Sequence, residues 1–154
     1  MKVIILAGGL GTRLPEYTKK IPKPMVKVAG YPIIVHLMKH YIISGFKEFF
    51  LATGYKSKEF KKYFRNYKKN GKAFEAIIFN KKCKVTILDT GLKTLTGGRL
   101  KKAAKHLKTQ EDFMFTYGDG LSNVNLNKLV RFHKRHGKKI TVTAVRPPAR
   151  FGEL

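Results

Sequence analysis

The chain has 154 residues, 43% of them hydrophobic, which is long and apolar enough to bury one sizeable core and excludes a disordered polypeptide. Its single cysteine excludes an internal disulfide and a zinc site built from cysteines. Thirty-three Lys and Arg against nine Asp and Glu give a formal net charge of +24, which favours anionic partners such as nucleic acid, anionic lipid or phosphorylated small molecules. The alternative explanation of this charge is that the lysines lie on solvent-exposed faces of helices and bind no partner.

Apolar runs of strand length alternate with apolar residues at helical spacing along the sequence. We expect strands at residues 2–7, 48–53, 74–79, 85–88, 113–117 and 140–145, and helices at 32–44, 57–67, 98–107 and 125–136. This alternation is typical of an α/β fold, and we expect a three-layer Rossmann-like domain with a largely parallel sheet over residues 1–154. No apolar run approaches the ~18 residues of a membrane-spanning helix, so a cytoplasmic protein without a membrane partner is expected.

A glycine-rich loop follows the first expected strand, in the sequence LAGGLGTRL at residues 6–14. Three glycines in four positions, from Gly8 to Gly11, let backbone N–H groups approach a ligand and form a concave anion site. Thr12 adds a hydroxyl, and Arg13 adds a guanidinium suited to phosphate oxygens. Residue 14 is leucine, so the dinucleotide fingerprint fails, and the chain has no P-loop motif. We predict a phosphate site of another kind, with an ordinary structural turn as the alternative.

Two further segments carry a charge in rigid surroundings. Lys23 stands between Pro22 and Pro24, which fix the backbone on both sides and indicate a cation held toward the glycine-rich loop. Asp119 stands between two glycines directly after the expected strand at 113–117, at the carboxyl end where α/β sheets bind ligands. A lone carboxylate there suits Mg²⁺, which takes one or two carboxylates together with phosphate oxygens and water. In both segments an ordinary turn is the alternative.

Aromatic residues recur on one face of the expected helix at 57–67, with lysines between them. Phe60, Tyr63, Phe64 and Tyr67 either pack against the sheet or stack on the bases of single-stranded RNA. We expect burial against the sheet, because a helix on a sheet needs an apolar face of this kind.

Five segments together resemble one family of enzymes. They are LAGGLGTRL at 6–14, KPMV at 23–26, VTILDTGLKTLTGGR at 85–99, FTYGDG at 115–120 and RPPARFGEL at 146–154. The first two resemble the start of the sugar-1-phosphate nucleotidylyltransferases. The other three are similar to the glucose-1-phosphate cytidylyltransferases within that family, and the resemblance runs from Met1 to Leu154.

The resemblance implies a nucleotide site around these segments. Lys23 would contact phosphate, Asp119 would bind Mg²⁺, and Arg13 and Lys23 would act in catalysis. The segment at 150–152 would begin the sugar site. The residues implied to contact substrate are Leu6, Ala7, Gly8, Gly9, Leu10, Gly11, Thr12, Arg13, Lys23, Thr94, Arg99 and Gly118.

The implied reaction transfers a cytidylyl group from CTP to glucose-1-phosphate and gives CDP-glucose and pyrophosphate, for the deoxysugars of bacterial surface polysaccharides such as lipopolysaccharide. Mg²⁺ would be the cofactor, full-length members would be homo-oligomers, and nucleic acid is not an expected partner. The family's second metal-binding aspartate and most of its sugar site lie beyond residue 154, so we expect a truncated, N-terminal portion of a longer enzyme. Three alternatives stay open: a fragment that only binds nucleotide, another sugar-1-phosphate nucleotidylyltransferase, and a nucleic-acid-binding domain.

Overall fold

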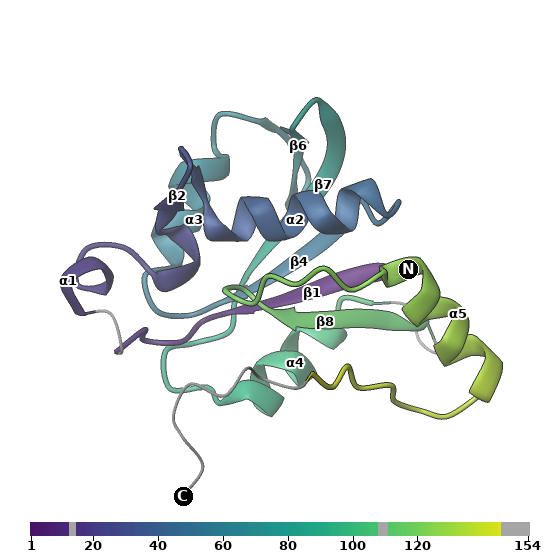
Figure 1. Ribbon diagram of the computed structural model, residues 1–154. Helices are drawn as coiled ribbons and strands as arrows, with labels where there is room; N and C mark the ends of the chain where they lie inside the picture. Colours follow the sequence, from purple (N-terminus) through teal and green to yellow (C-terminus); the bar gives the residue numbers. More distant parts are fainter. Residues whose placement is uncertain (13–14, 108–110, 146–154) are drawn as a thin grey trace, which may run out of the picture. The chain divides into compact units, whose positions relative to one another are not determined.

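The computed structural model describes residues 1–12, 15–107 and 111–145 and divides the chain into two compact units, residues 1–123 and 124–154 (Figure 1). The first unit contains a sheet with its helices, and the second contains helix α5 (Leu126–His136). No helix within the described ranges is long and apolar enough to cross a membrane.

A six-stranded mixed sheet forms the centre of the first unit. Its strands are β1 (Lys2–Ala7), β4 (Glu48–Thr53), β5 (Lys68–Asn70), β6 (Ala73–Ile78), β7 (Lys81–Asp89) and β8 (Phe113–Tyr117), in the order β5-β6-β7-β4-β1-β8. The strands β7, β4, β1 and β8 are parallel, and β5 and β6 extend the sheet as an antiparallel pair beside β7. The expected largely parallel sheet is therefore confirmed.

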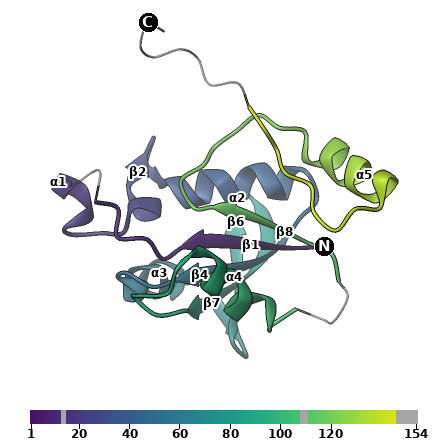
Figure 2. The ribbon, with the colours of Figure 1, turned by 90° about the horizontal axis from the view of Figure 1, so that it is seen from below.

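Helices cover both faces of this sheet. Helices α2 (Ile33–Ile43) and α4 (Thr96–Ala104) lie on opposite faces, as Figures 1 and 2 show. Parallel strands need such crossover connections, and the result is the expected three-layer fold. The remaining elements of this unit are helices α1 (Pro15–Thr18) and α3 (Ser57–Phe64), the 3-10 turn η1 (Lys23–Met25), and the short hairpin of β2 (Lys27–Val28) and β3 (Tyr31–Pro32).

The core forms on both sides of β1 and β4, which point alternate residues to the two faces. Ile4 and Phe50 pack with Ala103 of α4 on one face. On the other face Phe49 is fully buried, and its ring centre lies 6.5 Å from that of Tyr41 in α2. Because both faces are covered, these strands read in the sequence as continuous apolar runs.

Helix α3 buries the aromatic residues that the sequence places on one face. Phe60 and Phe64 are fully buried, and the ring centre of Phe64 lies 6.4 Å from that of Phe74 in β6. Packing against the sheet is therefore confirmed for these two rings, which are closed to the bases of an RNA strand. The helix ends at Phe64 rather than at residue 67, so Tyr67 lies beyond it and donates its hydroxyl hydrogen to the carbonyl of Ile77.

The observed bounds of other strands and helices differ from the expected ones. Strand β7 begins at Lys81 instead of residue 85, because antiparallel pairing with β6 extends it past the start of β4. Helix α4 runs from Thr96 to Ala104 rather than over 98–107. Ser57 begins α3 without capping it, because its hydroxyl lies 2.7 Å from that of Thr53 in β4 instead.

The expected strand at residues 140–145 is wrong, since these residues form no strand. Their β-branched sequence favours a strand only where a neighbouring strand supplies hydrogen bonds, and none of the described strands pairs with them. The helix before them is confirmed. Asn125 caps α5 by accepting a hydrogen bond from the amide of Lys128 at 2.9 Å, and Gly137 ends the helix at φ +62°.

Replacing Phe60 by alanine removes a fully buried ring and leaves a cavity, so we expect the free energy of unfolding to fall by about 3–5 kcal/mol. Ile43, at the end of α2, is 70% exposed, and Ile43→Ala is expected to change the same quantity by less than about 0.5 kcal/mol. Urea unfolding followed by circular dichroism measures both. Equal losses in the two variants would contradict the burial of the α3 face.

Candidate functional site

Four loops meet at one edge of the parallel sheet, where β1, β4, β7 and β8 end. They include residues 8–12, 54–56, 90–95 and 118–120. After β1 the chain continues to β4 on one side, and after α4 it returns to β8 on the other side of β1, so the strand order reverses here. Open α/β sheets bind ligands in the crevice at such a reversal. The glycine-rich loop and the predicted aspartate both lie at this edge.

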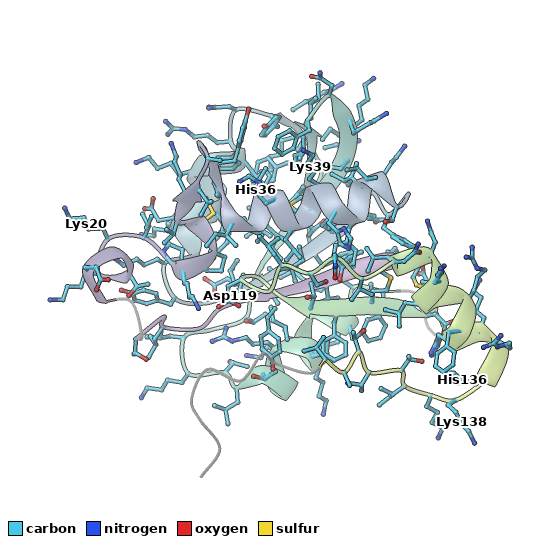
Figure 3. All side chains as sticks on the ribbon, in the orientation of Figure 1. Lys20, His36, Lys39, Asp119, His136 and Lys138 are labelled. Atoms are coloured by element: carbon cyan, nitrogen blue, oxygen red, sulfur yellow. The ribbon has the colours of Figure 1, made fainter. Side chains whose placement is uncertain are left out.

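Lys23 and Asp119 form an ion pair at this edge, with Nζ of the lysine 2.6 Å from Oδ2 of the aspartate. Lys23 begins the turn η1, which the amide of Met25 closes by donating to the carbonyl of Pro22 at 2.8 Å. Asp119 lies in the turn after β8, where Figure 3 labels it. The two side chains are 30% and 34% exposed, so both charged groups are accessible to a ligand.

The glycine-rich loop lies against the segments that carry this ion pair. The amide of Gly118 donates to the carbonyl of Leu6, at the end of β1, at 2.9 Å. A methyl group on Gly118 would approach the ring of Pro24 to 3.0 Å. Gly11 has φ +68°, and a Cβ placed on it would lie 3.3 Å from that of Lys23. These close approaches require glycine, and they bring the backbone of the loop beside the ion pair.

Arg99 of α4 is buried at the same edge, with 6% of its surface exposed. Its guanidinium donates to the carbonyl oxygens of Thr53, Gly91 and Leu92 at 3.0, 2.8 and 3.1 Å. It also donates to the hydroxyl of Thr90 at 2.7 Å. One side chain therefore ties the end of β4 to the loop after β7. Burial lowers the pKa of Arg99, but an arginine stays charged at neutral pH.

The guanidinium of Arg99 also packs against the start of the glycine-rich loop. A Cβ added to Gly8 or to Gly54 would overlap its Nη1 atom. The amide of Tyr55 donates to the carbonyl of Gly8 at 3.3 Å, and its hydroxyl donates to the carbonyl of Thr18 at 2.9 Å. The start of the loop is therefore held by α4 and by the loop after β4, while its far end lies beside the ion pair.

The described residues of the predicted site gather around this loop. Leu6, Ala7 and Gly8 are buried at the end of β1 and just beyond it, whereas Gly9, Leu10 and Thr12 are exposed. The hydroxyl of Thr94 donates to the carbonyl of Thr90 at 2.6 Å, beside Arg99. Arg13 and the segment at 150–152 lie outside the described residues. Contact between any of these residues and a substrate stays a prediction.

Several side chains that hold the site together were missed in the sequence. The buried Thr18 donates its hydroxyl hydrogen to the carbonyl of Gly11 at 2.9 Å, and Tyr55 fixes Thr18 in turn. Thr53 ends β4 and Thr90 follows β7. Both are buried, and Arg99 donates to the backbone carbonyl of Thr53 and to the hydroxyl of Thr90. No local pattern marks these residues, because each contact joins segments that are far apart in the chain.

Asp119 is the carboxylate best placed to hold a metal ion at this edge. The other acid here, Asp89 at the end of β7, accepts a hydrogen bond from the amide of Gly91 at 3.0 Å. Three strand spacings, roughly 14 Å, separate β7 from β8, so the two carboxylates do not share a metal. Among the described residues no three His, Cys, Asp or Glu side chains form a metal-binding group. A single carboxylate suits Mg²⁺ when phosphate oxygens and water supply the remaining ligands.

Comparison with known proteins gives the class of this α/β domain. Residues 2–153 match the family model described as nucleotidyl transferase, and the chain belongs to that family. It is 46% identical to a glucose-1-phosphate cytidylyltransferase of Salmonella typhimurium and 40% identical to a probable glucose-1-phosphate cytidylyltransferase of Bacillus subtilis. Both alignments cover the whole chain and 64% of the relative, so the chain spans a little under two thirds of their length.

Solved structures support the same fold. HddC from Yersinia pseudotuberculosis, complexed with GMP-PN, is 28% identical with a TM-score of 0.67 over 86% of this chain and 53% of that chain. A UDP-glucose pyrophosphorylase complexed with UDP-glucose has the same TM-score at 19% identity, over 88% of this chain and 54% of that chain, and shows the fold alone. The expected nucleotidyltransferase fold is confirmed.

Removing the Arg99 guanidinium takes hydrogen bonds from the carbonyls of Gly91 and Leu92 and from the buried hydroxyl of Thr90, so we expect Arg99→Met to lower the free energy of unfolding by about 1–3 kcal/mol. Lys101→Met, at an exposed position of the same helix, is the control and should change this quantity by less than about 0.5 kcal/mol. Urea unfolding compares the two variants. If Arg99→Met were as harmless as the control, the guanidinium would not hold these loops.

Proposed function

We propose that this chain provides the nucleotide-binding part of a glucose-1-phosphate cytidylyltransferase. The reaction joins the cytidylyl group of CTP to the phosphate of glucose-1-phosphate and releases pyrophosphate. The observation that carries this proposal is the ion pair of Lys23 and Asp119 beside the glycine-rich loop, at the edge where the strand order reverses. The 46% identity to a cytidylyltransferase supports CTP and glucose-1-phosphate as the substrates.

The glycine-rich loop would hold the phosphates of CTP. Its exposed backbone and the hydroxyl of Thr12 offer hydrogen-bond donors, and Arg13 adds a guanidinium. Because Gly8 and Gly118 have no side chain, the Arg99 guanidinium and the Pro24 ring pack directly against the backbone here. Arg99 packs behind Gly8, so its positive charge lies close to whatever the loop binds. Thr94 lies beside Arg99, because both side chains donate hydrogen bonds to Thr90.

Asp119 would be the protein ligand of Mg²⁺. The bound ion would neutralise phosphate charge and polarise an oxygen of the reacting phosphate. The ammonium of Lys23 already lies 2.6 Å from this carboxylate, so it can reach phosphate oxygens gathered around Asp119. Cation and carboxylate are therefore preorganised at one point before the substrate arrives.

This chemistry needs no general base from the protein, because the attacking phosphate oxygen of glucose-1-phosphate is already anionic at neutral pH. That oxygen forms a bond to the α-phosphorus of CTP, while the bond from this phosphorus to the bridging oxygen breaks and pyrophosphate leaves. The protein must bring two polyanions together and stabilise the charge on the transferring phosphorus. Arg13 and Lys23 are the cations that we assign to this task.

The direct test mixes the chain with CTP, glucose-1-phosphate and Mg²⁺ and measures pyrophosphate release in a coupled phosphate assay. We expect Asp119→Asn to abolish Mg²⁺-dependent CTP binding and turnover, because it removes the metal-binding carboxylate. Asp112→Asn, at an exposed position just before β8, is the control and should keep both. Equal effects of the two variants would contradict the role of Asp119.

A nucleotide-binding unit without turnover is the second candidate function, because the chain spans 64% of the length of its cytidylyltransferase relatives. Calorimetric titration with CTP and Mg²⁺ separates the two candidates. Binding of CTP without pyrophosphate release favours the second, and absence of CTP binding contradicts both.

Arg13→Ala and Lys23→Ala are each expected to lower kcat about 10²–10³-fold, or about 3–4 kcal/mol, by analogy with the loss of one oxyanion donor. Lys20→Ala is the control, because this exposed lysine belongs to the same segment as Lys23 and points elsewhere (Figure 3). Steady-state kinetics with CTP measures all three variants. A loss of less than tenfold in both Arg13→Ala and Lys23→Ala would contradict their roles.

A further inference from the structure

Three rings from separate segments gather on the outer side of α2. They are Tyr31 of β3, His36 of α2 and Phe79 of the turn between β6 and β7, and we call them the ring cluster. The ring centres of Tyr31 and Phe79 are 4.8 Å apart, and that of His36 lies 6.1 and 6.2 Å from them. Figure 3 shows His36 on the side of α2 that faces away from β1 and β8. Tyr31 is 47% and Phe79 36% exposed, so both rings are open to solvent.

The ring cluster is held in place by its surroundings. His36 donates from Nε2 to the carbonyl of Val28 at 2.7 Å, which fastens the β2–β3 hairpin to α2. Tyr31 lies directly opposite Val28 in that hairpin. The Tyr31 ring is therefore positioned before any partner binds, which lowers the entropy cost of binding.

Phe79 occupies a backbone position that disfavours a bulky side chain. The hairpin turn sets φ to +45° at Phe79 and +61° at Asn80, and turns of this kind favour Asn, Asp or Gly. A phenylalanine there is strained. The ring contacts Tyr31 and His36, and the ammonium of Lys39 lies 4.1 Å from its centre. A strained residue whose ring is partly open to solvent points to a binding role.

Lysines lie on or next to the segments of the ring cluster, and acidic residues are absent from these segments. Lys39 lies over Phe79, and Lys81 follows Phe79 by two residues. No Asp or Glu occurs between residues 17 and 47 or between residues 76 and 88. A partner that fits is therefore anionic and carries flat groups. A second copy of this chain, with a net charge of +24, would be repelled.

We propose that the ring cluster and its lysines bind single-stranded nucleic acid, with bases stacked on Tyr31 and Phe79 and phosphates on Lys39 and Lys81. Stacking on exposed rings in a basic surface is the usual basis of such binding. This role is independent of the proposed transferase function, and it differs from the expectation that nucleic acid is not a partner. Of the rings at 57–67 that the sequence suggested for RNA, Phe60 and Phe64 are buried, whereas Tyr31 and Phe79 are exposed.

Fluorescence anisotropy with a short labelled oligouridine at about 150 mM salt tests this proposal. We expect the double variant Tyr31→Leu, Phe79→Leu to bind tenfold or more weakly, or by about 1.4 kcal/mol, because leucine keeps apolar contact but offers no stacking surface. Tyr31→Phe keeps the ring and should bind like the parent. Lys39→Gln should lower the slope of log affinity against log salt by about 0.7, whereas the leucine variants should leave that slope unchanged.

Tyr31→Leu alone provides a second variant that leaves the strained turn intact, and thermal melting checks that each variant is folded. Equal affinities of the leucine variants and the parent would overturn the proposal and leave charge as the sole cause of binding. Displacement of the oligonucleotide by CTP would also overturn it, because the strand would then occupy the predicted nucleotide site. Absence of binding at this salt concentration, or tighter binding of an acidic peptide than of the oligonucleotide, would do the same.

Discussion

A buried guanidinium whose donors go to the backbone and one hydroxyl holds the loop edge of the sheet together. Arg99 comes from α4, and its acceptors come from the end of β4 and from the loop after β7. A buried cation is costly unless its donors are satisfied, so these loops must keep the arrangement that supplies the acceptors. The glycine-rich loop fits against the guanidinium because Gly8 and Gly54 lack side chains. The start of the glycine-rich loop and the loops after β4 and β7 are therefore held by one side chain that is almost hidden from solvent.

The parallel core could be predicted from the sequence because its strands are buried on both faces. In β1 and β4 this burial produces continuous apolar runs, and glycine follows each run. Helix α5 could also be predicted from local sequence, because Asn125 caps its start and Gly137 ends it. Strand β5 escaped prediction because its sequence, Lys-Lys-Asn, is polar, and pairing with β6 makes it a strand. The prediction of a strand at residues 140–145 was wrong for the opposite reason. These residues have a sequence typical of a strand, but none of the described strands pairs with them.

The site shows the same division between local and distant causes. Lys23 and Asp119 could be singled out because their own neighbours, prolines and glycines, made them unusual, and the fold then brought them to 2.6 Å. The hydrogen bond from Tyr55 to Thr18 left no such mark, because the two residues are 37 positions apart in the chain. For Arg99 the resemblance to a family named the residue but not its carbonyl partners, which only the folded chain assembles. The sequence therefore identified the charged residues of the candidate site better than the contacts that hold them in position.

The pairing order of the sheet decides when during synthesis the site can exist. Strand β1 is made first, yet it pairs with β4 on one side and with β8, near residue 113, on the other. The growing chain therefore contains its glycine-rich loop and Lys23 long before strand β8 and Asp119 have been translated. Parallel pairing over such separations is also slow to form. A site that needs both Lys23 and Asp119 is thus completed late in the synthesis of the chain.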